Sequence, residues 1–247
     1  MVTQEVRYWG PYRLLTRMRQ LGWRRLPEFP GRVVRRVEAY AGAPIHQRSF
    51  GQKTFTFAGQ THHYFVHNYT TTWRNERAVE IPLALDFLAR VKGSTLLEVG
   101  NVTRHFDRTT DHVVVDKYDD RPGVLSVDID TYQPDAPFGA LLSISTLEHV
   151  GWDEEPRDPQ KLRRVLEDLH RLVVPGGEVL VTLPIGYNDV LDALLADDQM
   201  PFADGRFLAR QPDGEWLEVE AADALEHAYG RPFDGANAIY VGSGLAT

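Results

Sequence analysis

Acidic residues stand at the ends of short apolar runs near the middle of the chain. Glu98 lies within the run 96–99, which Gly100 ends, and Asp116 follows the run 112–115. Short runs that are rich in β-branched residues and stop at Gly or Asp are typical of buried parallel strands, each ending at a ligand-facing loop. A carboxylate at the end of the second strand suits a ribose, because it can accept hydrogen bonds from both vicinal hydroxyls. We therefore predict a small-molecule site at the carboxyl ends of these strands.

A second polar stretch follows the apolar run 138–144. If residues 145–150 begin a helix, Ser145 and His149 lie one turn apart on the same face. Histidine titrates in the range that is useful for removing a hydroxyl proton, so His149 is the candidate base, with Glu148 beside it. The alternative is a histidine that only packs or hydrogen-bonds to the backbone.

The pattern around these residues predicts alternating strands and helices. Hydrophobic residues recur every three or four positions in the predicted helices, and the predicted strands are short apolar runs. Such alternation predicts an α/β fold with a doubly wound, mostly parallel sheet. The stretch 73–82 is expected to lead into a helix that runs to 91, and further helices are expected at about 158–173 and 189–196. The further strands are expected at 124–127, 138–144, 178–183, 206–210, 216–219 and 238–241.

The first 74 residues have a different character. Basic residues interleave with apolar ones at 11–26, which predicts an amphipathic helix. We expect it to pack on the acidic main domain; the alternatives are an anionic membrane, nucleic acid or an acidic partner. The stretch 53–69 alternates and predicts a β-hairpin. Its histidines, His62, His63 and His67, point to both faces of a strand, so we expect no metal site there. We predict an N-terminal helical and hairpin cap at 1–74 and a main domain at 75–247.

The central motifs resemble those of the class I S-adenosylmethionine (SAM) dependent methyltransferases. The stretch Leu97-Glu-Val-Gly-Asn-Val-Thr103 is similar to their first motif, although Val102 and Arg104 stand where glycine or small residues are usual. The stretch Leu147-Glu-His149 resembles a segment of the small-molecule branch of this family. The resemblance covers about 78–245 and implies a Rossmann-like fold, whose parallel sheet ends with an antiparallel final strand, with SAM as cofactor.

The resemblance also implies roles for individual residues. Asp116 corresponds to the acid that binds the ribose, and Asp128 to the acid that accepts from the adenine amino group, with Ile129 against the ring. The expected cofactor-binding set is Glu98, Gly100, Asn101, Asp116, Asp128, Ile129 and Ser145. The implied reaction is O-methylation of a small molecule, such as a sugar or natural-product hydroxyl.

Composition narrows the class of protein. Charged residues make up 25% of the 247 residues and the net charge is −8, which argues against a general nucleic-acid binder. Residues 1–50 carry a balance of +7, and the rest of the chain carries −15. No apolar stretch approaches the ~20 residues of a membrane span, so we expect a cytoplasmic protein. The sequence leaves open whether the protein is a monomer or a homodimer.

Four alternative interpretations also stay open. The stretch Asp128-Ile129-Asp130 also fits the metal-binding Asp-x-Asp of a nucleotide-sugar glycosyltransferase, and the altered glycines fit a non-catalytic methyltransferase-fold protein. The acidic stretch 153–155 is expected to be a solvated loop rather than a cation site. The polar residues 75–80 are either helix caps and surface pairs or part of a lid over the cofactor.

Overall fold

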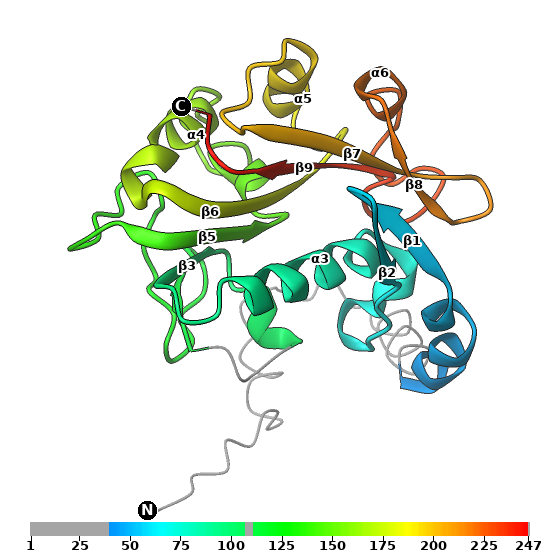
Figure 1. Ribbon diagram of the computed structural model, residues 1–247. Helices are drawn as coiled ribbons and strands as arrows, with labels where there is room; N and C mark the ends of the chain where they lie inside the picture. Colours follow the sequence, from blue (N-terminus) through cyan, green and yellow to red (C-terminus); the bar gives the residue numbers. More distant parts are fainter. Residues whose placement is uncertain (1–39, 107–110, 247) are drawn as a thin grey trace, which may run out of the picture.

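A computed structural model describes residues 40–106 and 111–246, so the predicted helix at 11–26 lies outside the described residues (Figure 1). The centre of the molecule is a seven-stranded sheet with the order β4-β3-β5-β6-β9-β7-β8. The strands are β3 (Leu96–Val99), β4 (Val113–Val115), β5 (Phe138–Ile144), β6 (Val173–Pro184), β7 (Asp204–Arg210), β8 (Trp216–Val219) and β9 (Ala238–Ser243).

The first four strands of the sheet are parallel, and the last strand of the chain is antiparallel to its neighbours. β3 pairs in parallel with β4 and β5, and β5 pairs in parallel with β6. β9 runs antiparallel between β6 and β7. Helices cover both faces of the sheet (Figure 1). The predicted Rossmann-like, doubly wound fold with an antiparallel final strand is confirmed.

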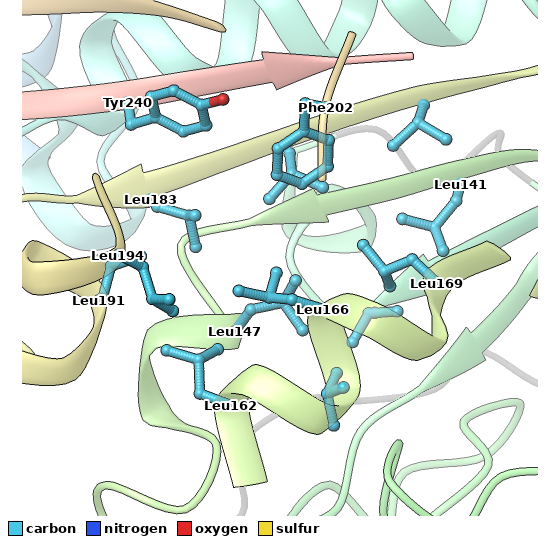
Figure 2. Close-up of a cluster of buried hydrophobic side chains, with 14 of the residues drawn as sticks. Leu141, Leu147, Leu162, Leu166, Leu169, Leu183, Leu191, Leu194, Phe202 and Tyr240 are labelled. Atoms are coloured by element: carbon cyan, nitrogen blue, oxygen red, sulfur yellow. The ribbon is translucent and has the colours of Figure 1, made fainter. Parts of the chain in front are cut away.

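One face is covered by α4 (Lys161–Leu172) and α5 (Asp189–Ala196). The stripe predicted from the sequence is buried here, and leucines of α4 and α5 pack against leucines of β5 and β6 (Figure 2). The short helix α6 (Ala221–Ala224), which the sequence did not indicate, follows β8.

The opposite face is covered by α3 (Arg77–Arg90), which contains Pro82. Proline cannot donate to the carbonyl four residues earlier, which belongs to Ala78. The N–H of Phe65 donates to that carbonyl instead, at 2.9 Å. The break in the helical hydrogen bonding is thus where the chain from the hairpin attaches to α3.

The predicted hairpin consists of β1 (Thr54–Phe57) and β2 (Gln60–His63), paired antiparallel. It packs beside β8, where the Tyr64 hydroxyl accepts a hydrogen bond from the backbone N–H of Trp216 at 2.8 Å. His62 pairs with Asp86 at 2.9 Å. In residues 40–106 and 111–246, no cluster of His, Cys, Asp and Glu has a metal-binding arrangement.

The structure departs from the prediction at the β4 edge of the sheet. The expected strand at 124–127 is reduced to a single bridge between Leu125 and Val115, so that prediction was wrong. Leu125 is 45% exposed and Val127 is 40% exposed, because within the described residues no α-helix covers this edge. β6 also begins at Val173, earlier than expected, and runs through the Pro-Gly-Gly turn with a shift in register.

None of the helices in the described ranges combines the length and hydropathy that a bilayer span requires.

Candidate functional site

The candidate site lies where the loops after β3, β4 and β5 meet. The parallel order places the carboxyl ends of these strands at one edge, and the chain reverses its direction of winding between β3 and β5. Doubly wound sheets bind ligands in the crevice at such a point. The loops that begin at Gly100, Asp116 and Ser145 therefore surround the expected ligand position.

Glu98 shapes the first of these loops from beneath. Its carboxylate is fully buried and accepts hydrogen bonds from the Val102 N–H at 3.0 Å and the Thr103 N–H at 2.7 Å. The Thr103 hydroxyl donates to it at 2.6 Å, and His112 Nε2 lies 2.6 Å from it. Both carboxylate oxygens are thus bonded within the protein, so Glu98 acts on a ligand through the loop that it holds.

Gly100 joins the loops after β3 and β5. Its φ is +87°, and a Cβ at this position would lie 2.1 Å from Thr146 Oγ1. Only glycine fits both constraints. The next turn is the short 3₁₀ helix η4 (Thr103–His105) rather than a long helix, and the Arg104 guanidinium donates to the Gly123 carbonyl at 2.7 Å. Val102 and Arg104, which replace the expected glycines, therefore belong to a short 3₁₀ turn and its N-cap, and not to the glycine-rich turn of the family motif.

Asn101 and Asp116 connect the first two loops. The Asn101 N–H donates to Asp116 Oδ2 at 3.0 Å, and the Tyr118 N–H donates to Asp116 Oδ1 at 3.0 Å. Each carboxylate oxygen has a second acceptor position left for a ligand hydroxyl. The Asn101 side chain donates to Asp119 at 2.8 Å, while its buried Oδ1 has no partner among the described residues.

Asp128 is drawn into an ion-pair network beside this site. Lys117 Nζ and Lys161 Nζ lie 2.8 Å and 2.5 Å from Asp128 Oδ2. Glu154 pairs with the same two lysines, at 2.9 Å and 2.7 Å. Burial opposes ionisation of Asp128, but the bonds from Lys117 and Lys161 outweigh it and lower the pKa of Asp128. Ile129 packs into the core on the α4 face.

The segment 145–150 does not form the expected helix. It contains the short 3₁₀ helix η5 (Leu147–His149), and Ser145 adopts a φ of +37°. The Ser145 hydroxyl donates to buried Glu80, whereas the His149 ring is 44% exposed. The expected common face of Ser145 and His149 was therefore wrong.

His149 instead forms a chain of polar contacts with Asp153 and Tyr187. Its Nδ1 lies 2.6 Å from Asp153 Oδ2, which also accepts from the Tyr187 hydroxyl at 2.6 Å. Its Nε2 faces Glu148 Oε1 at 3.3 Å. Burial opposes ionisation of Asp153, but the bonds from Tyr187 and His149 lower its pKa. Asp153 and Glu154 of the acidic stretch therefore bind side chains rather than solvent alone.

Three buried carboxylates and one arginine lie beneath this chain of contacts. Glu76 and Glu80 come from the start of α3, and Glu148 from η5; they are 8%, 0% and 2% exposed. Arg77 donates to Glu80 at 2.8 Å and to the Ile144 carbonyl at 3.2 Å. We call Glu76, Glu80, Glu148 and Arg77 the acidic group. Glu76 and Glu80 are buried, so they do not form the surface ion pairs that were one interpretation of residues 75–80.

The acidic group perturbs the residues within it and around it. Burial raises the pKa of the Glu148 carboxyl well above its usual range, and burial together with Glu80 raises that of Glu76. Burial, with Glu76 and Glu148 nearby, raises the pKa of Tyr229 to about 12. Perturbed groups of this kind gather at functional sites. Sequence reasoning missed Tyr187 and Tyr229, and it considered Glu76 and Glu80 only among the polar residues 75–80.

Comparisons with known proteins find resemblance only among solved structures. No family model matches the chain, and no curated protein matches it. The glycopeptide N-methyltransferase MtfA is 13% identical, with a TM-score of 0.35 over 66% of this chain and 89% of that chain. The N-methyltransferase NodS from Bradyrhizobium japonicum WM9 is 12% identical, with a TM-score of 0.39 over 68% and 85%.

The Burkholderia thailandensis 1,6-didemethyltoxoflavin-N1-methyltransferase is 14% identical, with a TM-score of 0.40 over 70% of this chain and 80% of that chain. At these identities and TM-scores, the likenesses carry no conclusion about function.

Proposed function

We propose that this chain is a SAM-dependent methyltransferase that acts on a small molecule. The observation that carries the proposal is the meeting of Gly100, Asn101 and Asp116 at the point where the sheet reverses its winding. A positive-φ glycine after the first strand and a carboxylate at the end of the next are features by which doubly wound sheets bind nucleotides at this position.

The residues present fit SAM as the cofactor. Asp116 keeps acceptor capacity for two ribose hydroxyls, and the buried Oδ1 of Asn101 has no partner in the described residues. Asp128 and Ile129 are proposed to border the adenine, with Asp128 held in place by its two lysines. Glu98 and Ser145 contribute by fixing the loops at 100–103 and 145–149.

The proposed reaction is O-methylation, for which bound SAM would supply an electrophilic methyl group. His149 is the proposed base: its Nδ1 is held by Asp153, so Nε2 is the nitrogen left to take the proton of an acceptor hydroxyl. Glu148 lies beside that nitrogen at 3.3 Å. The remaining contribution is proximity, because an in-line displacement depends on holding the acceptor near the methyl carbon.

The glycosyltransferase interpretation has less support. Asp128 is paired with two lysines, and Asp130 lies 3.3 Å from Arg164, so neither carboxylate stands ready for a metal. With this proposal we still expect a small-molecule acceptor, no nucleic-acid partner and a cytoplasmic location. A monomer and a homodimer are both compatible with it.

A titration with S-adenosylhomocysteine tests the proposal. The folded chain should bind this ligand, and Asp116→Ala should weaken binding by about tenfold or more, since each bond to a charged group contributes ~1.5–3 kcal/mol. Asp120→Ala removes an exposed carboxylate from the same loop and serves as the matched control. Binding of UDP-sugar with manganese, and no binding of S-adenosylhomocysteine, would decide for the glycosyltransferase.

A further inference from the structure

When its three carboxyls are ionised, the acidic group holds more negative charge than its own arginine can balance. Arg77 contacts Glu80, and the second oxygen of Glu80 accepts from Ser145 and Thr182. Glu76 accepts from the Ala236 N–H at 2.8 Å. Three carboxylates therefore share one guanidinium in a region that is shielded from water.

Glu148 is the least satisfied of the three. It is 2% exposed, and its Oε2 is buried without a hydrogen-bond partner in the part of the chain that the structure describes. Its other oxygen, Oε1, lies 3.3 Å from His149 Nε2. A buried, unpartnered carboxylate is costly, so its retention points to a ligand that completes it. A positively charged group of a ligand would best stabilise such a carboxylate.

The position of Glu148 in the sheet suggests which positive charge this is. Glu148 follows β5, which is two strands from β4 and its Asp116. Neighbouring strands lie ~4.8 Å apart, so about 10 Å separates β4 from β5. The sulfur of SAM is attached to the ribose carbon next to the ring. With the ribose at Asp116, a cofactor that extends toward β5 brings its sulfonium to the loop that carries Glu148.

We propose that Glu148, supported by Glu76 and Glu80, recognises the positive charge at the methyl-transfer position and makes the site prefer the sulfonium cofactor to its neutral thioether product. This inference rests on the proposed function. Attraction between unlike charges is strong where water is excluded. Methyl transfer leaves the sulfur uncharged, so the same residues would weaken the hold on the product and favour its release.

Equilibrium titrations with three ligands test this inference without measuring turnover. SAM carries a sulfonium, sinefungin carries an amine at the equivalent position, and S-adenosylhomocysteine is neutral there. Wild-type protein should bind SAM and sinefungin at least about tenfold more tightly than S-adenosylhomocysteine. Glu148→Gln keeps the size of the side chain and removes its charge; it should abolish this preference while leaving the affinity for S-adenosylhomocysteine unchanged.

Two further variants make the test specific. Glu76→Gln removes a second carboxylate of the acidic group and should reduce the preference for SAM more weakly. Glu167→Gln removes an exposed carboxylate on α4 and should change nothing.

Each contrary result identifies what has failed. Equal affinity of the wild type for all three ligands would overturn the inference while leaving the proposed function intact. So would an equal loss for all three in Glu148→Gln, which would mark Glu148 as structural. If the folded wild type binds none of the three ligands, the proposed function fails, and the inference with it.

Discussion

The orientation of His149 depends on two residues that lie outside the Leu147-Glu-His149 segment. Asp153, four residues later, holds Nδ1, and the Tyr187 hydroxyl donates to the same carboxylate oxygen. Such a third group keeps a base in one tautomer and one orientation. The chemistry proposed for His149 therefore depends on the whole contact chain and not on the histidine alone.

Replacing His149 by Ala should lower turnover by about 10²–10⁴-fold with an accepted hydroxyl substrate. Cofactor affinity should change little, because the proposed ribose contact belongs to a different loop. Asp153→Asn should lower turnover in the same direction but by less. Turnover and S-adenosylhomocysteine binding are measured separately, with His63→Ala, at an exposed residue of the hairpin, as control. Near-normal turnover in His149→Ala would leave proximity alone to explain the rate.

The buried Glu148 carboxyl should make stability depend on pH. Burial raises its pKa in the folded state above the usual value of 4.5. A group of this kind contributes stability that is fully present below the unfolded pKa and is lost as the pH rises through the folded pKa. The charged and titratable groups that face Glu148 are Glu76, Arg77 and Glu80 of α3, His149, Tyr187 and Tyr229.

Glu148→Gln should therefore stabilise the protein at pH 8 and change little near pH 4.5. The gain should appear as the pH rises, because ionising the buried Glu148 carboxyl costs more free energy in the folded state than in the unfolded state. Thermal melting of wild type and variant between pH 4.5 and 8.5 measures the difference, with Glu167→Gln as control. A constant difference across this range would show that Glu148 does not titrate between the two states.

At the scale of elements, the loop after β3 depends on one glycine. Gly100→Ala places a Cβ in the left-handed region, at about 1–2 kcal/mol, and adds a contact of 2.1 Å with Thr146 Oγ1. Gly93 has a similar φ of +94°, and a Cβ there would have no atom within 4 Å, so Gly93→Ala measures the backbone cost alone.

We expect Gly100→Ala to destabilise the protein more than Gly93→Ala and to weaken S-adenosylhomocysteine binding, which Gly93→Ala should preserve. Denaturant unfolding and titration measure the two effects. Equal destabilisation by both substitutions would mean that the loops after β3 and β5 can separate without cost.

Elements with strong periodicity could be predicted from the sequence, and the contacts between distant elements could not. The runs at 138–144, 189–196 and 216–219 match β5, α5 and β8 in full, because each has a clear apolar pattern with polar or turn residues at its ends. The run at 124–127 has the same apolar character, but its apolar side chains are largely exposed and it forms one bridge.

The same distinction between local patterns and long-range contacts applies to the residues of the candidate site. Gly100, Asp116 and His149 stand at recognisable positions within local motifs, so the sequence indicated them. Glu80 accepts a hydrogen bond from Ser145, which is 65 residues away in the sequence, and Tyr187 donates to Asp153, which is 34 residues away. No local pattern encodes such contacts, because they depend on how α3 and the end of β6 pack against η5.

At the scale of the whole molecule, the described hairpin belongs to the same core as α3. Phe55 and Tyr64 are buried in one cluster with Val79, Phe87 and Trp216. The predicted boundary between 74 and 75 would place these residues in different units. The shared cluster favours one cooperative unit for the hairpin and the sheet.

Tyr64→Phe tests whether the hairpin and the sheet unfold together. The variant keeps the ring but leaves the buried backbone N–H of Trp216 without its acceptor, which should cost about 1–3 kcal/mol of the free energy of unfolding. Because the residues share one core, we expect one transition, shifted equally by tryptophan fluorescence and far-ultraviolet circular dichroism. Tyr118→Phe, at a residue that is 72% exposed, is the matched control and should not shift the transition. An early, separate transition in Tyr64→Phe, with the main one unmoved, would instead show that the hairpin is a cap that opens independently of the sheet.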